Sequence, residues 1–496
     1  MWSRMSSFNP ETIILLGDSI YADKRGSKPL THFVAATPDE IKNKYKTLIN
    51  DRTFLDMVEK VGGWDSIAAT FDDHDYGINN GDKSYPFAKQ SQELFWDFVQ
   101  EPSDSSRRKQ AGVYSSKLHT IIIPRSGASD SAAGSPKFTY KIIMLDTRSN
   151  KDVAPSLFGS KNDIHDDSDF LGEEQWQWLA KELESDVDLI LLGSSIQALP
   201  TDKLTEELWG MFPNARRRLL SLIVGAKCPN VLILSGDVHY AEVSKAKCKW
   251  NEIRVEGKEG DSSEEIIPRK STIWELTSSG LTHTFYMQSE RRIDHSNLMR
   301  SKLSSNSNDV WSQAKAFIYN IYQASFPSRY REQRYGDHYS GLNFGLIDIN
   351  IDDTTENSAT DRYSRESCVN NATCVTKSTH AISSHDIVMD DVMTAPPNKV
   401  ISVTFRAMNS EGQAIIEKKI PLKPKTVLER GRISDLECEP FWGNVPHWRL
   451  PLMYLMVFAP VIGLLFIHFG IILFVIRFLF LSLKRNSATE RVYSRL

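Results

Sequence analysis

The chain has 496 residues, of which 41% are hydrophobic, and its formal net charge is −4 at pH 7. This length and apolar content are enough to bury a large core. Because there is no excess of basic residues, the composition argues against a nucleic-acid-binding protein, and no nucleic-acid partner is expected.

Three short apolar runs are each followed, at once or within one residue, by an acidic string. They have the pattern of strands buried on both faces, and they span residues 12–16, 67–71 and 231–234. Two further runs, at 142–145 and 189–192, lead into Arg148 and into residues 193–195. Because ligand sites of layered α/β proteins lie beyond the carboxyl ends of their strands, we expect these polar groups to meet in one region.

The acidic strings supply ligands for two adjacent metal ions. The Asp18 carboxylate can bridge two cations, Asp73 can hold one of them, and Asp237 with His239 can reach the other. Tyr21 lies three residues after Asp18, and its phenolate favours a trivalent ion such as iron. Two ions about 4 Å apart activate water for in-line attack on a phosphoester, so the pattern predicts metal-assisted phosphoester hydrolysis.

Two further side chains are candidates for catalysis. His74 can protonate the leaving alkoxide or donate to a phosphate oxygen, and Arg148 can clamp an oxyanion through two parallel hydrogen bonds. Each string also has a plainer interpretation. The Gly-Asp pairs are common turn formers, the Asp-Asp-His-Asp string can be a solvated loop or a helix cap, and Arg148 can be an ordinary ion-paired arginine. Only their joint occurrence favours a metal site.

These strings resemble the PhoD-like (alkaline phosphatase D) family of metallophosphatases. Further segments also resemble that family in its order, at residues 171–179, 212–216, 275–283 and 343–345. The resemblance extends from about residue 12 to about residue 422. It implies a four-layer α/β/β/α sandwich and a metal-ligand set of Asp18, Tyr21, Asp73, Asp237 and His239. It also implies Fe³⁺ at the tyrosine-bearing position and a neighbouring divalent ion, often Ca²⁺, with an added amide oxygen from Asn79 or Asn80.

One departure concerns the start of the chain. The family pattern has a first strand that ends in Gly-Ser-Cys, whose cysteine is an iron ligand, whereas only 11 residues precede the first apolar run here. We therefore expect that the N-terminal strand is missing from this sequence, or that the metal site has changed.

The C-terminal part predicts a membrane anchor. Residues 452–483 are almost continuously apolar, longer than the ~20 residues that span a bilayer, and 454–476 are expected to form one transmembrane helix. The short tail at 484–496 is basic, which predicts a cytosolic tail and a lumenal or extracellular catalytic domain. A tail-anchored protein with a cytosolic domain is the alternative, because no signal peptide is visible at residues 1–10.

Cysteines and the remaining segments complete the prediction. Cys368 and Cys374 flank the glycosylation acceptor Asn371 and can form a disulfide, while Cys438 has no evident partner. A helix is expected over 170–183, a closing hairpin over 399–422 and a surface insertion over 250–269. The domains are thus a catalytic domain at 1–422, a juxtamembrane tether at 423–451, the transmembrane segment and the tail.

The sequence thus predicts a membrane-anchored metallophosphatase that acts on phosphomonoesters or phosphodiesters. A nuclease or pyrophosphatase that uses the same two ions is one alternative. The other is a catalytically silent membrane-bound binding module on the same fold.

Overall fold

A computed structural model describes residues 1–25, 33–123, 137–153, 168–203, 207–256, 263–282, 284, 326–333, 336–353, 399–425, 431–443, 452–453 and 455. Within these residues the chain is a mixed α/β protein, as the sequence predicted. The predicted transmembrane segment lies almost entirely outside the described residues, as do Asn371, Cys368 and Cys374.

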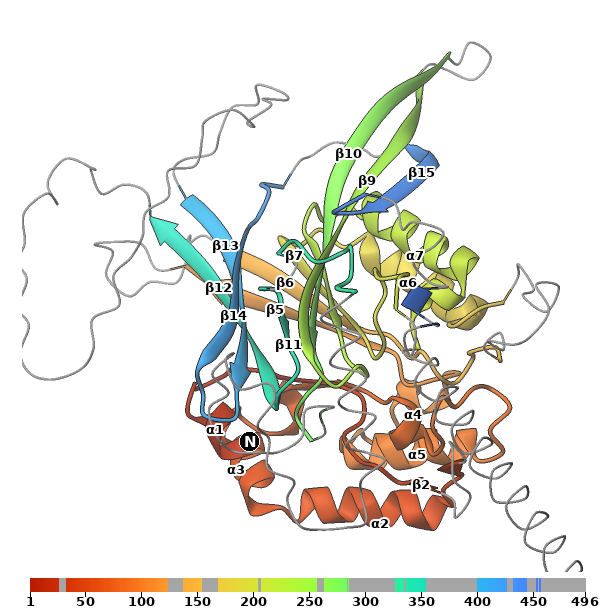
Figure 1. The fold of residues 1–496 in the computed structure, drawn as a ribbon, viewed down its shortest axis with the longest axis vertical. Helices are drawn as coiled ribbons and strands as arrows, with labels where there is room; N and C mark the ends of the chain where they lie inside the picture. The colour runs from red at the N-terminus through yellow and green to blue at the C-terminus, as the bar shows by residue number, and fades with distance from the viewer. Residues whose placement is uncertain are drawn as a thin grey trace, which may run out of the picture.

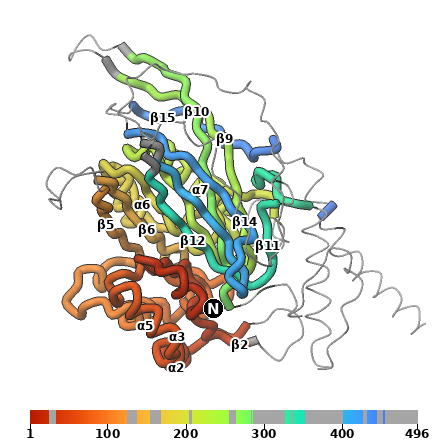
Figure 2. Tube along the Cα trace, turned by 90° about the vertical axis from the view of Figure 1, so that its left-hand side faces the viewer, coloured from red at the N-terminus to blue at the C-terminus, as the bar shows by residue number. Residues whose placement is uncertain are grey.

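The largest described sheet contains eight strands in the order β11-β9-β10-β8-β7-β6-β5, with β15 paired to β9. Its strands are β5 (Ser115–Ile122), β6 (Lys137–Met144), β7 (Leu189–Ser194), β8 (Val231–Ser235), β9 (Ala241–Glu256), β10 (Ser263–Ser278), β11 (His338–Tyr339) and β15 (Arg432–Pro440). Strands β6, β7, β8 and β10 run parallel, so their carboxyl ends share one edge. The long β9–β10 hairpin projects at the end of the molecule that lies opposite α2 and α3 (Figure 2).

Three smaller groups of strands accompany this sheet. They are the parallel pair β1 (Ile13–Leu16) and β4 (Ile67–Thr70), the antiparallel β12 (Asn343–Asp353), β13 (Lys399–Asn409) and β14 (Ala414–Pro421), and the short pair β2 (Lys24–Arg25) and β3 (Phe33–Val34). In the β1–β4 pair Leu16 is aligned with Thr70, so the acidic residues that follow the two strands emerge side by side.

The helices are short and mostly amphipathic. They are α1 (Trp2–Ser6), α2 (Pro38–Ile49), α3 (Arg52–Lys60), α4 (Asp73–Tyr76), α5 (Ala88–Phe98), α6 (Gly172–Leu183) and α7 (Pro213–Gly225), with 3₁₀ turns η1 (Trp64–Ser66), η2 (Ser106–Lys109) and η4 (Trp209–Met211). Helix α2 starts with a capping box between Thr37 and Glu40 and has Pro38 in its first turn. The Asp51 side chain caps α3 by accepting two backbone N–H groups.

Three clusters of buried hydrophobic side chains show the order in which the layers of helices and strands pack. Helices α6 and α7 cover one face of the large sheet, where Leu192 and Ile233 are buried. The other face, with Leu191 and Leu234, packs against β13, β14 and the inner side of β1. Helices α2, α3 and α5 bury the outer side of β1 and β4 (Figure 1). The elements therefore follow one another as helices, large sheet, smaller strand groups and helices.

Most predicted elements are confirmed. The five apolar runs form β1, β4, β6, β7 and β8, the helix predicted over 170–183 is α6, and the hairpin predicted over 399–422 is β13–β14. Within the predicted surface insertion at 250–269, the described residues on both sides of the tip continue β9 and β10 as one regular hairpin. Trp250 packs against the core and Glu252 is buried, so the β9 side of this segment is only partly exposed.

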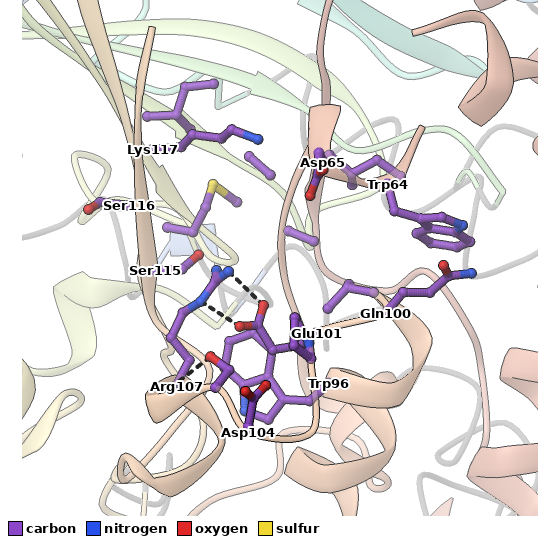
Figure 3. Close-up of a pocket in the computed structure, with 18 residues that line it drawn as sticks. Trp64, Asp65, Trp96, Gln100, Glu101, Asp104, Arg107, Ser115, Ser116 and Lys117 are labelled. Carbon is purple, nitrogen blue, oxygen red and sulfur yellow. Dashed lines mark hydrogen bonds and ion pairs between the residues drawn. The ribbon is translucent and has the colours of Figure 1, made fainter. Parts of the chain in front are cut away.

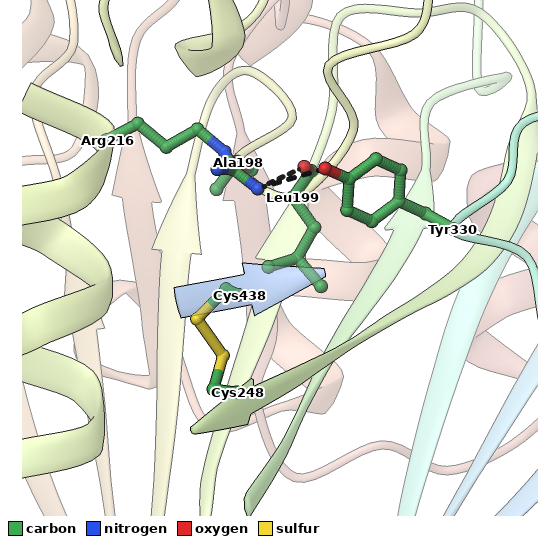
Figure 4. Close-up of a disulfide and its surroundings, with 6 residues drawn as sticks. All are labelled: Ala198, Leu199, Arg216, Cys248, Tyr330 and Cys438. Carbon is green, nitrogen blue, oxygen red and sulfur yellow. Dashed lines mark hydrogen bonds between the residues drawn. A yellow bond between two sulfur atoms is a disulfide. The ribbon is translucent and has the colours of Figure 1, made fainter. Parts of the chain in front are cut away.

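The C-terminal region also differs from the prediction. Residues 432–440, predicted to lie in a tether, form β15, which pairs with β9. Cys438, for which the sequence showed no evident partner, forms a disulfide with Cys248 (Figure 4). The pairing was not evident from the sequence, because 190 residues separate the two cysteines. No helix in the described part of the chain is long and apolar enough to cross a bilayer.

Candidate metal centre

The ends of β1, β4 and β8 bring the predicted acidic residues together. Leu16 and Leu234 lie in one buried cluster between the facing layers, so the loops after β1 and β8 approach each other. The approach depends on glycine. A Cβ atom on Gly17 would lie 2.4 Å from the Asp72 Cβ, and one on Gly236 would lie 3.3 Å from the Leu16 carbonyl oxygen. Only glycine leaves room for these loops to meet.

Four carboxylates form the centre of the site. Asp18, Asp72, Asp73 and Asp237 each offer an oxygen, and these oxygens all lie within 4.8 Å of one another. Asp18 and Asp73 make a second such group with His74. The structure thus places three predicted ligands, Asp18, Asp73 and Asp237, in one cluster, and it adds Asp72, which the sequence had not singled out.

The backbone at these ligands is unusual. Asp18, Asp237 and His239 have positive φ angles of 50°, 68° and 60°, in the left-handed region that most side chains avoid. Each such residue costs about 1–3 kcal/mol and persists only where its surroundings fix it. The chain therefore holds these side chains in set directions at some expense of stability.

The described residues fit a bound cation. The Asp18 Oδ1 and Asp72 Oδ2 atoms are buried and have no hydrogen-bond partner among the described residues. Burial, and then repulsion from Asp73 and Asp72, raises the pKa of Asp18 well above its ordinary value. Because buried like charges at this distance repel strongly, a cation among them would satisfy both the orphaned oxygens and the charge.

Neighbouring groups adjust the charge of the cluster. Burial raises the pKa of Asp72 to about 6 against the lowering effect of Arg148. Burial also works to raise the pKa of Asp73, but the charges of Arg148 and His74 outweigh burial, so the pKa of Asp73 is lowered. Asp73 also accepts the Asn80 N–H at 2.6 Å. Of Asp18, Asp72 and Asp73, only Asp73 therefore has a lowered pKa, which favours its ionised form.

Asp75 supports the loop that carries Asp18. Its carboxylate accepts the backbone N–H groups of Ile20 at 2.9 Å, Asp72 at 3.1 Å and Ser19 at 3.3 Å. Burial raises the pKa of Asp75 to about 7. The Asp-Asp-His-Asp string thus combines ligands with the carboxylate that fixes their neighbours.

Tyr21 lies at the edge of the cluster. Its hydroxyl donates to the Asp18 Oδ2 at 3.1 Å, and its ring lies 4.4 Å from the His74 ring and 6.4 Å from the His239 ring. Burial, followed by the Asp18 charge, raises the pKa of Tyr21. Tyr21 and His239 therefore face the site, but their roles as metal ligands stay predictions.

His74 is held by a residue that the sequence did not reveal. Its Nδ1 lies 2.6 Å from the Asp23 Oδ1, while the Asp23 Oδ2 accepts the Asn79 N–H at 2.9 Å. Burial works to lower the pKa of His74, but the Asp23 carboxylate outweighs it and raises the pKa. The contacts shown by Asn79 and Asn80 are through backbone atoms, so an amide oxygen from either side chain stays a prediction.

Arg148 forms buried ion pairs, which was one of the two interpretations of this residue in the sequence. Its side chain is fully buried, its Nε donates to the Asp72 Oδ1 at 2.5 Å, and its Nη1 donates to Glu207. Lys151 pairs with the same Glu207 at 2.5 Å. The Nη2 of the guanidinium is buried and has no hydrogen-bond partner among the described residues. These contacts favour a role in positioning Asp72, and the phosphate clamp stays a prediction.

One cavity in the described part of the chain lies away from the acidic cluster. It has a volume of about 470 Å³ and is lined by residues from the start of β4, the α5–η2 loop and β5. Arg107 and Glu101 form an ion pair in its wall (Figure 3). None of the four clustered carboxylates lines it, so a phosphoester would have to approach the carboxylates from elsewhere.

The fold and the acidic cluster together define a mixed α/β protein with a candidate metal centre at its strand ends. A family model described as PhoD-like phosphatase matches residues 1–325. Because this match covers more than half of the chain, the protein belongs to the PhoD-like phosphatase family, and the resemblance seen in the sequence is confirmed.

We also compared the chain with solved structures and with curated proteins. A solved structure titled "Structure of PhoD" is similar, with a TM-score of 0.37 and 17% sequence identity over 56% of this chain and 52% of that chain. The chain thus spans about half the length of that structure. No curated protein matches.

Proposed function

We propose that the chain is a metal-dependent phosphatase that hydrolyses phosphomonoesters or phosphodiesters with two metal ions. The observation that carries this proposal is the group of four carboxylates, two buried and two half-buried, at the ends of β1, β4 and β8, inside the segment that matches the family. Bound cations would supply a water of lowered pKa and would stabilise the entering and leaving oxygens.

The side chains divide the remaining tasks. Asp18, Asp73 and Asp237 would hold the ions, with Asp18 shared between them because its carboxylate has two oxygens and one of them, Oδ1, is buried without a hydrogen-bond partner among the described residues. His74, oriented by Asp23, is the proton donor to the leaving alkoxide. Arg148 compensates the charge of Asp72 and holds it toward the cluster.

The test is Asp18→Asn, which keeps the side-chain shape and removes the charge. We expect the purified variant to lose at least one metal ion, and we expect its rate of hydrolysis of chromogenic phosphomonoesters and phosphodiesters to fall roughly a hundredfold or more. Asp97→Asn is the control, since Asp97 is exposed and pairs only with Arg108 among its described contacts. Wild-type turnover in the Asp18 variant would refute the two-metal assignment. A wild-type chain that binds no metal would favour the silent binding module.

We further propose Fe³⁺ beside Tyr21 and Ca²⁺ or another divalent ion at the neighbouring position. Tyr21 and His239 frame one side of the carboxylate cluster, which supports a harder, more highly charged ion there. The oxidised protein should then absorb visible light through phenolate-to-iron charge transfer. Tyr21→Phe should remove this band and most of the activity while the protein stays folded. A colourless, active wild-type enzyme would point to two divalent ions.

Finally, we propose that residues 452–483 anchor the protein in a membrane with the catalytic domain on the lumenal or extracellular side. The apolar run and the basic tail support this, as does the Cys248–Cys438 disulfide, since disulfides persist mainly in oxidising compartments. Glycosidase treatment should then shift the mobility of the expressed protein through a glycan on Asn371. Protease digestion of sealed microsomes should cleave the tail. A protected tail without a glycan would support the tail-anchored alternative.

A further inference from the structure

A second group of buried charges lies beside the segment that carries Asp237 and His239, and the proposed chemistry does not use it. We call it the Lys203 cluster, and it consists of Gln197, Lys203, Tyr240, Glu242 and Arg331. All five residues are nearly or fully buried. They come from the loop after β7, from the start of β9 and from the segment before β11, which are far apart in the sequence.

Lys203 is the centre of this cluster. Its Nζ donates to the Gln197 Oε1 at 2.7 Å, to the Glu242 Oε1 at 3.0 Å and to the Tyr240 hydroxyl, so the three N–H bonds of the ammonium all have acceptors. Its Nζ also lies 4.7 Å from the centre of the Tyr240 ring. Arg331 completes the cluster by donating its Nε and Nη2 to the Glu242 Oε2, both at 2.8 Å.

Such a cluster is costly to build. Two cations and a carboxylate are removed from water, and a buried ion pair is often no more stabilising than apolar residues of the same size. A well-packed apolar group would hold the three segments together equally well. The buried charges are therefore better explained by a need for fixed geometry than by a need for stability.

The geometry that they fix is that of the metal-ligand segment. Tyr240 follows His239 directly, and its carbonyl oxygen accepts the Ser279 N–H at 3.1 Å, while the Ser279 hydroxyl accepts the His239 N–H at 3.1 Å. On the other side of His239, Val238 donates its N–H to Gly236 at 2.9 Å. These bonds hold the backbone, and Lys203 holds the side chain of Tyr240. The left-handed conformations of Asp237 and His239 thus have an anchor immediately after them.

We propose that Lys203 is a positioning residue for the metal centre, acting through the Tyr240 hydroxyl and ring to set the directions of His239 and Asp237. The expected effect on metal binding and hydrolysis rests on the proposed function. The expected effect on the backbone at 236–241 does not. Lys203 has no role in contacting the substrate. Its effect reaches the centre through one peptide bond.

The experiment compares Lys203→Met and Tyr240→Phe with the wild-type chain, each stripped of metal. Mn²⁺ is the probe, and its unbound fraction is measured by electron paramagnetic resonance. We expect each variant to bind Mn²⁺ at least about tenfold more weakly, the usual effect of removing a residue that orients a metal ligand. Hydrogen exchange of the backbone at 236–241 should be faster in both variants in the absence of any metal.

Lys245→Met is the matched control. Lys245 lies in β9 and, like Lys203, is a buried lysine. Its Nζ is 2.6 Å from the Glu332 Oε1 and 4.8 Å from the centre of the Trp274 ring. No described contact joins it to Tyr240. It should lower thermal stability without changing Mn²⁺ affinity or exchange at 236–241. A merely structural role for Lys203 predicts that all these variants behave alike.

A double-mutant cycle tests the route of the effect. If Lys203 acts through the Tyr240 hydroxyl, the variant that carries both Lys203→Met and Tyr240→Phe should have about the same Mn²⁺ affinity as the single variant with the lower affinity. The second change would then remove no further interaction. Lys203→Arg, which keeps the charge, should restore part of the affinity and serves as a second variant if Lys203→Met does not fold.

The outcomes separate the two proposals. Wild-type Mn²⁺ affinity and wild-type exchange in Lys203→Met would overturn the positioning role. A wild-type chain that binds no Mn²⁺ would instead refute the proposed function, and the exchange rates at 236–241 would still decide whether Lys203 fixes this segment.

Discussion

Replacing Gly17 by alanine is a sharp test of how the metal centre is assembled. Gly17 has a φ angle of 99°, and an alanine Cβ would lie 2.4 Å from the Asp72 Cβ and 2.7 Å from the Asp72 nitrogen. Non-bonded carbon atoms normally stay at about 3.5–4.0 Å, so the loops after β1 and β4 would have to separate by more than about 1 Å. Asp18, the next residue, would move with the β1 loop.

The expected magnitude has two parts. The positive φ angle costs an alanine about 1–3 kcal/mol, and overpacking of this kind typically costs about another 1–3 kcal/mol. Gly63→Ala separates them, because Gly63 has a similar φ angle of 101° but its added Cβ would meet nothing within 4 Å. The difference in the free energy of unfolding between the two variants therefore isolates the contact with Asp72.

Urea denaturation of both metal-free variants gives this difference, and metal titration gives its functional consequence. We expect Gly17→Ala to be about 1–3 kcal/mol less stable than Gly63→Ala and to bind metal at least about tenfold more weakly, whereas Gly63→Ala should bind metal normally. Equal stability and equal metal affinity in the two variants would refute the close approach of the β1 and β4 loops at this site.

Three further predictions concern the fold and the charges around the site. Replacing Cys248 and Cys438 by alanine should lower the free energy of unfolding by up to about 5 kcal/mol, because the disulfide spans 190 residues; an unchanged urea midpoint under oxidising conditions would contradict this. Glu207→Gln should cost about 3–5 kcal/mol in the same assay, because it leaves buried cations with less compensating charge, and a loss below about 1 kcal/mol would argue against the buried pair. Because Asp23 raises the pKa of His74, their interaction should stabilise the metal-free fold below the ordinary histidine pKa of about 6.5 and fade as the pH rises through the raised value. Asp23→Asn should therefore destabilise the protein more at pH 6 than at pH 9, and equal losses at the two pH values would contradict the assignment.

The strands and three of the clustered carboxylates could be predicted because their signals are local. A continuous apolar run that ends in Gly-Asp or Asp-Asp predicts both a buried strand and a polar loop at its end, whatever the partner strand is. Asp18, Asp73 and Asp237 were found in this way, and the structure places their carboxylate oxygens together. The helix at 170–183 and the hairpin at 399–422 were likewise visible as periodic patterns.

Other features were decided by contacts between segments that no local pattern relates. Arg148 reads as an available cation in the sequence, but the fold buries it between Asp72 and Glu207, 76 and 59 residues away. Lys203 becomes an anchor for Tyr240 only because the loop after β7 and the start of β9 meet at one sheet edge. The bond between Cys248 and Cys438 depends on β15 pairing in register with β9. The sequence by itself therefore predicted which acidic residues would gather at the strand ends, since residue type and strand pattern are local properties. The tertiary structure alone decided which charges compensate and orient those ligands, because burial and long-range register depend on how all the layers pack.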